Sequence, residues 1–339
     1  MHRVAIGVMF ALAVPCAAAA ATPSAAKPSM PVATFSIVAR DPATGELGVA
    51  VQSHWFSVGS VVPWAEAGVG AVATQSFVEP SYGPKGLALM KQGVAPKEAL
   101  AQLLAGDPQR DVRQVAFVDA KGRVAVHTGT KCIPGAGQHA GDGYTTEANL
   151  MLTNEVPDAM ARAFEAATGP LAERMLAALD AAQGVGGDVR GRQSAAILVV
   201  RAKATDKPWT DRIVELRVED HAEPLVELRR LLTLHRAYEL MNRGDDASAI
   251  GKMDEALKNY GAAALMVPDN DEFVFWTAVT LVVNGRTDDA LPLFAKAFRM
   301  NPSWMLLLPR LPAVGQLPDS PGLVPRILAV GPKADLVAK

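Results

Sequence analysis

The chain has 339 residues, half of them hydrophobic and a fifth charged, with a formal net charge of −2. This length and apolar content are sufficient for two domains with hydrophobic cores. A nearly neutral chain without a long basic run gives no electrostatic reason to expect a nucleic acid as a partner.

The N-terminal segment has the features of an export signal. A cationic start at Arg3 precedes an apolar run that ends in small residues, with Ala19 and Ala21 as the simplest cleavage points. The run has about 13 residues, whereas a membrane-spanning helix needs about 20. We therefore expect residues 1–21 to be the signal peptide of a secreted or periplasmic protein, with no membrane contact after signal removal. Residues 22–33 contain three prolines and predict an extended linker.

Beyond the linker, apolar periodicity and turn residues predict strands and helices in a regular order. The predicted elements are strands over 34–40, 47–53, 60–64 and 69–75, helices over 82–93 and 95–107, strands over 113–119 and 123–129, a glycine-rich loop over 129–147, helices over 157–167 and 170–183, and strands over 194–201 and 212–220.

This order predicts an α+β fold for residues 34–222. Neighbouring strands can pair antiparallel through short turns, and each helix pair carries one apolar stripe that needs a sheet face to cover. Two packed antiparallel sheets with helices on both outer faces satisfy the pattern. We therefore expect a four-layer α/β/β/α sandwich.

The C-terminal part has a different, helical pattern. Residues 223–310 predict a small all-α domain, and 311–339 a tail. The spacing resembles two tetratricopeptide-like helix pairs, because alanines and prolines recur 34 residues apart. The positions that match are Tyr238, Leu240, Gly244, Ala256, Tyr260, Ala263 and Pro268 in the first copy, and Gly285, Ala290, Phe294, Ala297 and Pro302 in the second. We expect this region to pack against the first domain and to bind a protein partner.

Thr34 is the first residue of the first predicted strand, directly after the linker. A hydroxyl is a weak nucleophile unless a base takes its proton, and a free terminal amine with a pKa near ~8 can be that base within the same residue. Cleavage before Thr34 would place such a group at a strand end between the two sheets. The alternative is that Thr34 is an ordinary β-branched strand residue.

Two further segments could complete such a site. In the loop GGDVRGRQSAA, Asp188 would orient the amine, Gln193 or the backbone would donate to an oxyanion, and Arg192 would contact the substrate. The alternative is a solvated turn in which Asp188 pairs with Arg192. Gln75 and Ser76 are second candidates for an oxyanion donor and thus for substrate binding, with a local structural role as the alternative.

Histidines and one cysteine raise the question of a metal. His127 and His139 flank Cys132, and these are zinc-ligand types, but their spacing fits no common structural site. We expect no metal and no other cofactor, with His127 and His54 lining a substrate pocket. Cys132 is the one cysteine outside the signal, so it forms no internal disulfide and is either a buried structural thiol or a reactive one.

Several segments in combination resemble one family over about residues 34–236. They are ATFSIVARDPATGELGVAVQS, VGSVVPWAEAGVGAVATQ, YGPKGL, HTG, GDGY, GGDVRGRQSAA and LRVEDH. The family is called domain of unknown function 1028 and is grouped with the N-terminal nucleophile hydrolases. The resemblance implies the same sandwich and the nucleophile position for Thr34, and it implies no known substrate.

A looser comparison with proteasome-type hydrolases adds two residues and one departure. Ser53 and Gln52 occupy the comparable end of the second strand, as a catalytic and a substrate-binding candidate. The lysine expected near the nucleophile is missing, because no Lys, Arg or Asp lies between Gln52 and Val78.

Two functional hypotheses follow, together with a weaker variant. The first is an exported hydrolase that cleaves a small amide or peptide through a Thr34 acyl-enzyme. The second is a catalytically silent sandwich that acts as a periplasmic scaffold through its helical region. Because family members with a C-terminal domain are sometimes described as peptidoglycan-binding, the variant associates with the cell wall.

Overall fold

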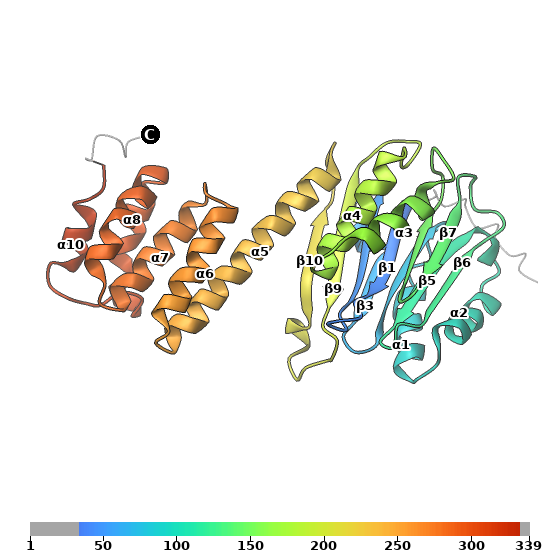
Figure 1. The fold of residues 1–339 in the computed structure, drawn as a ribbon, viewed down its shortest axis with the longest axis horizontal. Coiled ribbons are helices and arrows are strands. Elements are labelled where there is room, and N and C mark those ends of the chain that lie inside the picture. The colour runs from blue at the N-terminus through green and yellow to red at the C-terminus, as the bar shows by residue number, and fades with distance from the viewer. Residues whose placement is uncertain (1–33, 333–339) are drawn as a thin grey trace, which may run out of the picture. The chain divides into compact units, whose positions relative to one another are not determined.

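The computed structural model describes residues 34–332 (Figure 1). The expected signal peptide, the linker and the last residues of the expected tail lie outside the described residues. Within the described part, no helix combines the length and the apolar character that crossing a membrane requires.

Two antiparallel sheets form the N-terminal part of the molecule. The six-stranded sheet has the order β10-β9-β2-β1-β8-β7, and the four-stranded sheet has the order β3-β4-β5-β6. The strands are β1 (Thr34–Arg40), β2 (Leu47–Ser53), β3 (Pro63–Glu66), β4 (Gly70–Ser76), β5 (Arg113–Asp119), β6 (Val124–Thr128), β7 (Gly137–Gly141), β8 (Tyr144–Ala148), β9 (Ser194–Val200) and β10 (Arg212–Val218).

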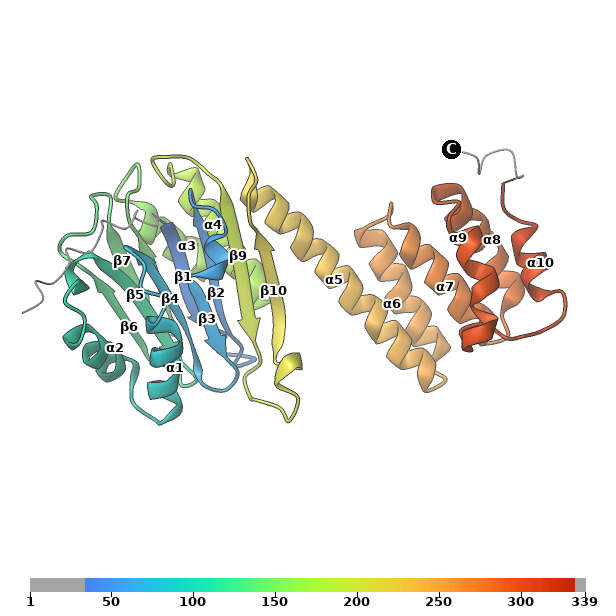
Figure 2. The same cartoon turned by 180° about the vertical axis from the view of Figure 1, so that it is seen from behind.

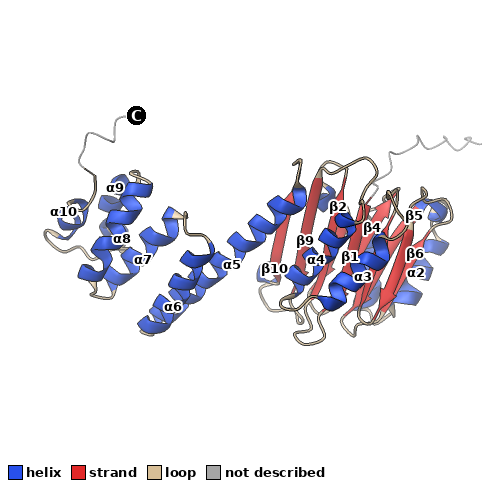
Figure 3. Cartoon of the chain, turned by 45° about the horizontal axis from the view of Figure 1, so that its top comes forward, coloured by secondary structure: helices blue, strands red, loops and turns tan. Residues whose placement is uncertain are grey.

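Helices cover the outer face of each sheet, as Figures 2 and 3 show. One helix pair, α3 (Val156–Ala166) and α4 (Leu171–Gly184), packs on the six-stranded sheet. The other pair, α1 (Tyr82–Lys91) and α2 (Pro96–Ala105), packs on the four-stranded sheet. The expected four-layer α/β/β/α sandwich is therefore confirmed.

The alternation of side chains along β1 shows how one strand serves two cores. Phe35 and Ile37 pack under α3 and α4, whereas Val38 belongs to the core between the sheets. The apolar part of this inter-sheet core is made by side chains from both sheets, namely Val38, Val49, Val51, Ala71, Ala73, Ala116 and Val118.

The expectation of a loop over 129–147 is wrong for its second half. Residues 137–148 form a hairpin, β7 and β8, and β8 pairs with β1 in the six-stranded sheet. Gly143 provides the positive φ of 76° that the tight turn requires. The glycines and buried polar residues of this segment hid the strand pattern, because the inward side chains Thr145 and Glu147 are not apolar.

The C-terminal part is a series of helices. They are α5 (Pro224–Ala249), α6 (Met253–Met266), α7 (Asp271–Val283), α8 (Thr287–Met300), α9 (Trp304–Leu307) and α10 (Leu323–Leu328). In the pair α5–α6, a β-carbon on Gly244 would lie 2.2 Å from the Tyr260 ring, so only glycine allows this close packing. Ala256, Tyr260, Ala290 and Phe294 are buried at the positions that suggested helix pairs. The tetratricopeptide-like assignment itself stays a prediction.

The first half of α5 packs into the core of the sandwich. Leu225, Leu228 and Leu232 join the apolar cluster beneath α3 and α4. Arg236 forms an ion pair with Glu173 of α4 at 2.8 Å. The core of the sandwich thus continues past residue 222 into α5.

This packing predicts a difference between two neighbouring positions on α5. Leu228 is 0% exposed and Val226 is 65% exposed. Leu228→Ala should lower the free energy of unfolding by about 2 to 5 kcal/mol, because it removes buried methyl groups and leaves a cavity. Val226→Ala, the control, should change it by less than about 0.5 kcal/mol. Urea unfolding measures both, and equal effects would show that α5 is not part of this core.

Candidate active site

Thr34 lies at the start of β1 and faces the four-stranded sheet. Because side chains alternate along the strand, Thr34, Ser36 and Val38 share the inter-sheet face. The neighbouring strand β2 places Ser53 directly opposite Thr34 in the register. The Thr34 hydroxyl donates to Ser53 Oγ at 3.3 Å, so two of the predicted catalytic residues are in contact.

The inter-sheet layer changes from apolar to polar toward this end of β1. We call the polar end the polar cluster, which consists of Thr34 and Ser36 of β1, Ser53 of β2, Gln75 of β4, Gln114 of β5, Glu147 of β8 and Asn149 directly after β8. All these residues are buried with no exposed surface. Such a group must find hydrogen-bond partners inside the protein, because buried polar atoms without partners destabilise the fold.

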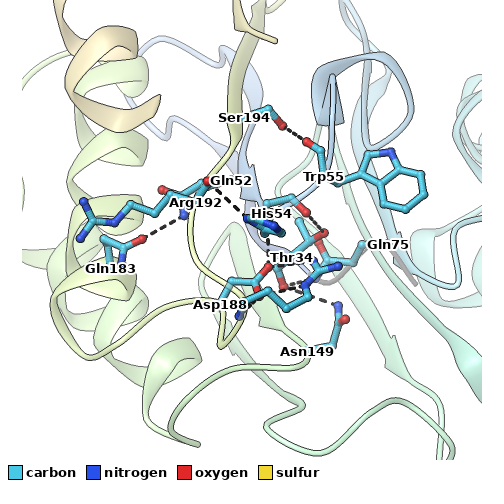
Figure 4. Close-up of polar contacts among 12 residues, drawn as sticks. Thr34, Gln52, His54, Trp55, Gln75, Asn149, Gln183, Asp188, Arg192 and Ser194 are labelled. Atoms are coloured by element: carbon cyan, nitrogen blue, oxygen red, sulfur yellow. Dashed lines mark hydrogen bonds and ion pairs between the residues drawn. The ribbon is translucent and has the colours of Figure 1, made fainter. Parts of the chain in front are cut away.

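The backbone carbonyl of Thr34 is held by several donors. It accepts from the Asn149 backbone N–H at 3.1 Å, from Gln75 Nε2 at 3.4 Å and from Asn149 Nδ2 at 3.5 Å. Figure 4 shows Gln75 and Asn149 beside Thr34. Thr34 is therefore fixed at both its hydroxyl and its carbonyl, although in the full-length chain it is 0% exposed.

Asp188 brings a buried carboxylate to the same region, next to Thr34 in Figure 4. An isolated bridge between Met151 and Asp188 anchors its loop. The carboxylate accepts from the backbone N–H groups of His54 at 3.1 Å and Arg190 at 2.9 Å, and it forms an ion pair with the Arg190 guanidinium at 2.8 Å.

The expected alternative, an ion pair between Asp188 and Arg192, is wrong. Arg190 is the partner of Asp188, and Arg192 instead pairs with Glu223 at the surface. Gly191, with a φ of 112°, lies between the two arginines and directs them to different sides.

Three of the predicted site residues point away from Thr34. Gln52 alternates to the opposite face of β2 and donates to Gln183 of α4 at 3.0 Å. Gln193 donates to Asp220 at 3.1 Å, at the surface. His127 lies on the helix-covered face of β6 and contacts the Arg110 carbonyl at 2.9 Å. The structure does not bring these side chains into the polar cluster.

The other candidates lie near the edge of the site or beside it. The His54 ring contacts the Arg192 carbonyl at 3.4 Å, and Figure 4 shows His54 beside Asp188. Ser76 lies beside Cys132, and burial raises the pKa of that thiol although the Ser76 hydroxyl lowers it in part. Cys132 is therefore protonated at neutral pH, which makes it a poor nucleophile.

The side chains that suggested zinc do not converge. His139 contacts Asp158 at 2.8 Å, while Cys132 donates to the Arg113 carbonyl at 3.4 Å. Across residues 34–332 there is no group of three or more His, Cys, Asp or Glu side chains arranged to hold a metal ion.

Sequence reasoning missed four members of the polar cluster: Ser36, Gln114, Glu147 and Asn149. For the first two a signal existed, because each occupies an inward position of an otherwise apolar strand. Glu147 was hidden by the expectation of a loop over 129–147, and Asn149 follows that segment, where no element was predicted.

The family match coincides with the part of the chain that holds this cluster. The model of the Family of unknown function (DUF1028) matches residues 34–228. The chain belongs to the DUF1028 family. The match begins at Thr34 and ends inside the first half of α5, so the later helices lie beyond it.

A solved structure of a DUF1028 protein has a fold similar to that of this domain. The crystal structure of protein SPO2555 from Silicibacter pomeroyi is 30% identical to this chain, with a TM-score of 0.53. The similarity covers 59% of this chain and 88% of that chain. No curated protein matches the sequence.

Two ion pairs of this DUF1028 domain, Asp188–Arg190 and Glu223–Arg192, differ in burial and should therefore cost different amounts of stability when one partner is removed. Asp188→Ala should lower the free energy of unfolding by about 3 kcal/mol, because it removes a buried carboxylate that pairs with the Arg190 guanidinium and accepts from two backbone N–H groups. Glu223→Ala, which removes the exposed partner of Arg192, should cost about 1 kcal/mol or less. Thermal or urea unfolding compares the two variants. Equal costs would mean that Asp188 has no structural role in this loop.

Proposed function

We propose that this DUF1028 protein is an exported hydrolase of a small amide or peptide, with Thr34 as its N-terminal nucleophile. The observation that carries the proposal is the position of Thr34. It begins a strand, its hydroxyl meets Ser53 between the sheets, and its carbonyl is fixed by Gln75 and Asn149. A nucleophile held in this way is already oriented before a substrate binds, which lowers the entropic cost of attack.

The chemistry requires a free amine on Thr34. In the full-length sequence this nitrogen is acylated by Ala33, and the amide nitrogen is not a base. Removal of residues 1–33 would free the amine. The cut could come from a protease in the linker, from signal cleavage, or from attack of the Thr34 hydroxyl on the Ala33 carbonyl followed by hydrolysis of the ester.

In the freed enzyme the amine accepts the proton of the Thr34 hydroxyl as the oxygen attacks the substrate carbonyl. The protonated amine then returns the proton to the leaving nitrogen as the C–N bond breaks, which leaves an ester on Thr34. Water, activated by the same amine, hydrolyses that ester. The buried carboxylate of Asp188 favours the protonated amine during attack, because an opposite charge nearby stabilises the charged form.

The contacts of Gln193 do not favour it as the oxyanion donor. Gln193 is engaged with Asp220, whereas the side-chain amides of Gln75 and Asn149 reach Thr34. Both N–H donors of each amide are already engaged, one with the Thr34 carbonyl and one with Gln114 Oε1. We therefore assign Gln75 and Asn149 the role of positioning Thr34, and Gln193 no longer stands as the oxyanion donor.

A binding role without catalysis is the second candidate function. The complete burial of Thr34 in the uncleaved chain favours it, because a buried hydroxyl cannot reach a substrate. In that case the sandwich would serve as a secreted or periplasmic scaffold, and the helical region would recruit a protein partner or associate with the cell wall.

Labelling by an acylating probe, such as a β-lactone, separates the two functions. A chain that begins at Thr34 should be acylated on Thr34, Thr34→Ser should still react, and Thr34→Ala should not. Cys132→Ser is the matched control and should label like the wild type, because burial keeps the thiol protonated. Peptide mapping by mass spectrometry locates the label. Labelling of Cys132, or none at Thr34 in a folded protein, would contradict the proposal.

We also propose that the helical region is a partner surface and not part of the active site. The polar cluster and Asp188 all come from residues 34–188, before α5 begins. A chain that ends after residue 240 keeps Leu225, Leu228 and Arg236 in place and should label at the rate of the full chain. Loss of labelling in a truncated chain with normal thermal unfolding would place part of the site in the helical region.

A further inference from the structure

The Ser36 hydroxyl faces two oxygen atoms at the centre of the polar cluster. Gln75 Oε1 lies 2.7 Å from Ser36 Oγ, and Glu147 Oε1 lies 3.0 Å from it. A hydroxyl has one proton, so it can donate to only one of these oxygens. The other contact must receive its proton from a different group.

Gln114 fixes the direction of the hydrogen bonds. Its Nε2 atom lies 3.1 Å from the carbonyl of Gly137 and 3.0 Å from that of Ala148. Backbone carbonyls only accept, so this end of the side chain must be the amide nitrogen and cannot be exchanged with the oxygen. Gln114 Oε1 is therefore an acceptor, which receives Gln75 Nε2 at 2.8 Å and Asn149 Nδ2 at 2.9 Å.

The directions of these hydrogen bonds determine which group supplies the proton between Ser36 and Glu147. Because Gln75 donates to Gln114 through its nitrogen, its Oε1 atom faces Ser36 and must accept the Ser36 proton. Ser36 Oγ is then an acceptor for the Glu147 carboxyl group, which has to supply a proton of its own. An ionised Glu147 would face Ser36 without any proton between the two oxygens.

We propose that Glu147 is a neutral carboxylic acid that donates to Ser36 and so acts as a positioning residue for Thr34. The chain of donors runs from Glu147 to Ser36, then to Gln75, whose amide holds the Thr34 carbonyl. The protonation of Glu147 stands without the proposed function, whereas its effect on Thr34 reactivity rests on it.

The surroundings of Glu147 agree with a neutral acid. Burial raises its pKa well above the usual value, and the Ser36 hydrogen bond lowers it only in part. The second carboxyl oxygen, Oε2, has no hydrogen-bond partner within residues 34–332. The residues directly opposite Glu147 in its own sheet, Ser36 of β1 and Gln138 of β7, are uncharged. The residues of the opposite sheet that join the polar cluster, Gln75 and Gln114, are uncharged amides.

The direction in which pH changes the stability follows from the difference in bound protons between the folded and the unfolded chain. Above the ordinary glutamate pKa the unfolded chain has lost this proton, but the folded chain keeps it. The unfolded state therefore binds fewer protons, and stability falls as pH rises until the folded-state pKa of Glu147 is reached. One such group makes the unfolding equilibrium constant rise tenfold per pH unit in that window.

Three variants of the full-length chain test the proposal. Glu147→Gln keeps a donor to Ser36, since its carboxamide mimics the neutral acid. Ser36→Ala breaks the chain of donors. Thr145→Val is the matched control, because Thr145 is buried on the same face of β8 and its hydroxyl has no partner in the described chain.

Urea unfolding is measured from mildly acidic to alkaline pH. The ratio of the unfolding constants of wild type and Glu147→Gln should rise tenfold per pH unit, and Thr145→Val should follow the wild type. Infrared spectra are recorded at neutral pH on protein that is isotope-labelled at glutamate. The wild type should show the carbonyl band of a protonated carboxylic acid, and this band should be missing in Glu147→Gln. Parallel pH profiles together with a carboxylate band in place of the acid band would overturn the proposal.

The rate of Thr34 acylation, measured on the same variants in chains that begin at Thr34, is a readout that a merely structural role of Glu147 would not change. Glu147→Gln should react like the wild type at neutral pH and keep its rate at alkaline pH, where the wild type loses it. Ser36→Ala should react more slowly at every pH. An equal loss in Glu147→Gln and Ser36→Ala would refute the positioning role. Failure of every chain to label, wild type included, would count against the proposed function and leave the protonation result standing.

Discussion

The structure depends on one constraint: the polar groups enclosed between the two packed sheets must form hydrogen bonds inside the protein. The strand β1 turns Thr34 and Ser36 toward the opposite sheet, where no side chain of the polar cluster has exposed surface. Most of these polar atoms find partners among the others, because an unpaired buried polar group costs about 1 to 3 kcal/mol. Within residues 34–332, Glu147 Oε2 and Asn149 Oδ1 are the atoms of the cluster without a partner. The result is a connected network with fixed donor directions, in contrast to the apolar packing around Val38 at the other end of the same layer.

This constraint links folding to the proposed chemistry. The residues that satisfy Thr34, namely Gln75, Asn149 and Ser53, also fix the position of its carbonyl and its hydroxyl. The sheets are held in place from outside by helix pairs that pack on apolar side chains such as Phe35 and Phe117. A rigid scaffold around a reactive group is the usual way in which enzymes maintain catalytic geometry. The buried carboxylate of Asp188 lies next to Thr34, and Arg190 of the same loop is its ion-pair partner.

Much of the fold could be predicted from the sequence, because its main strands and helices follow simple periodicity. Phe35 and Ile37 alternate with Val38, and the helix pairs carry one apolar face, so the four layers follow. The hairpin β7–β8 could not be predicted, since its inward residues are polar and its glycines suggest a loop. Thr34 and Ser53 could be placed by strand pairing. Gln193 and Arg192 could not, because one glycine in their loop decides which way each side chain points.

The central claim is that Thr34 becomes the first residue of the working protein. Intact-mass measurement and N-terminal sequencing of the protein isolated from the exported fraction of its host test this claim most directly. We predict a chain that begins at Thr34, whose amine is free to act as the base. A protein that begins uniformly at Thr22 and resists acylation would contradict the enzymatic account and support the silent scaffold.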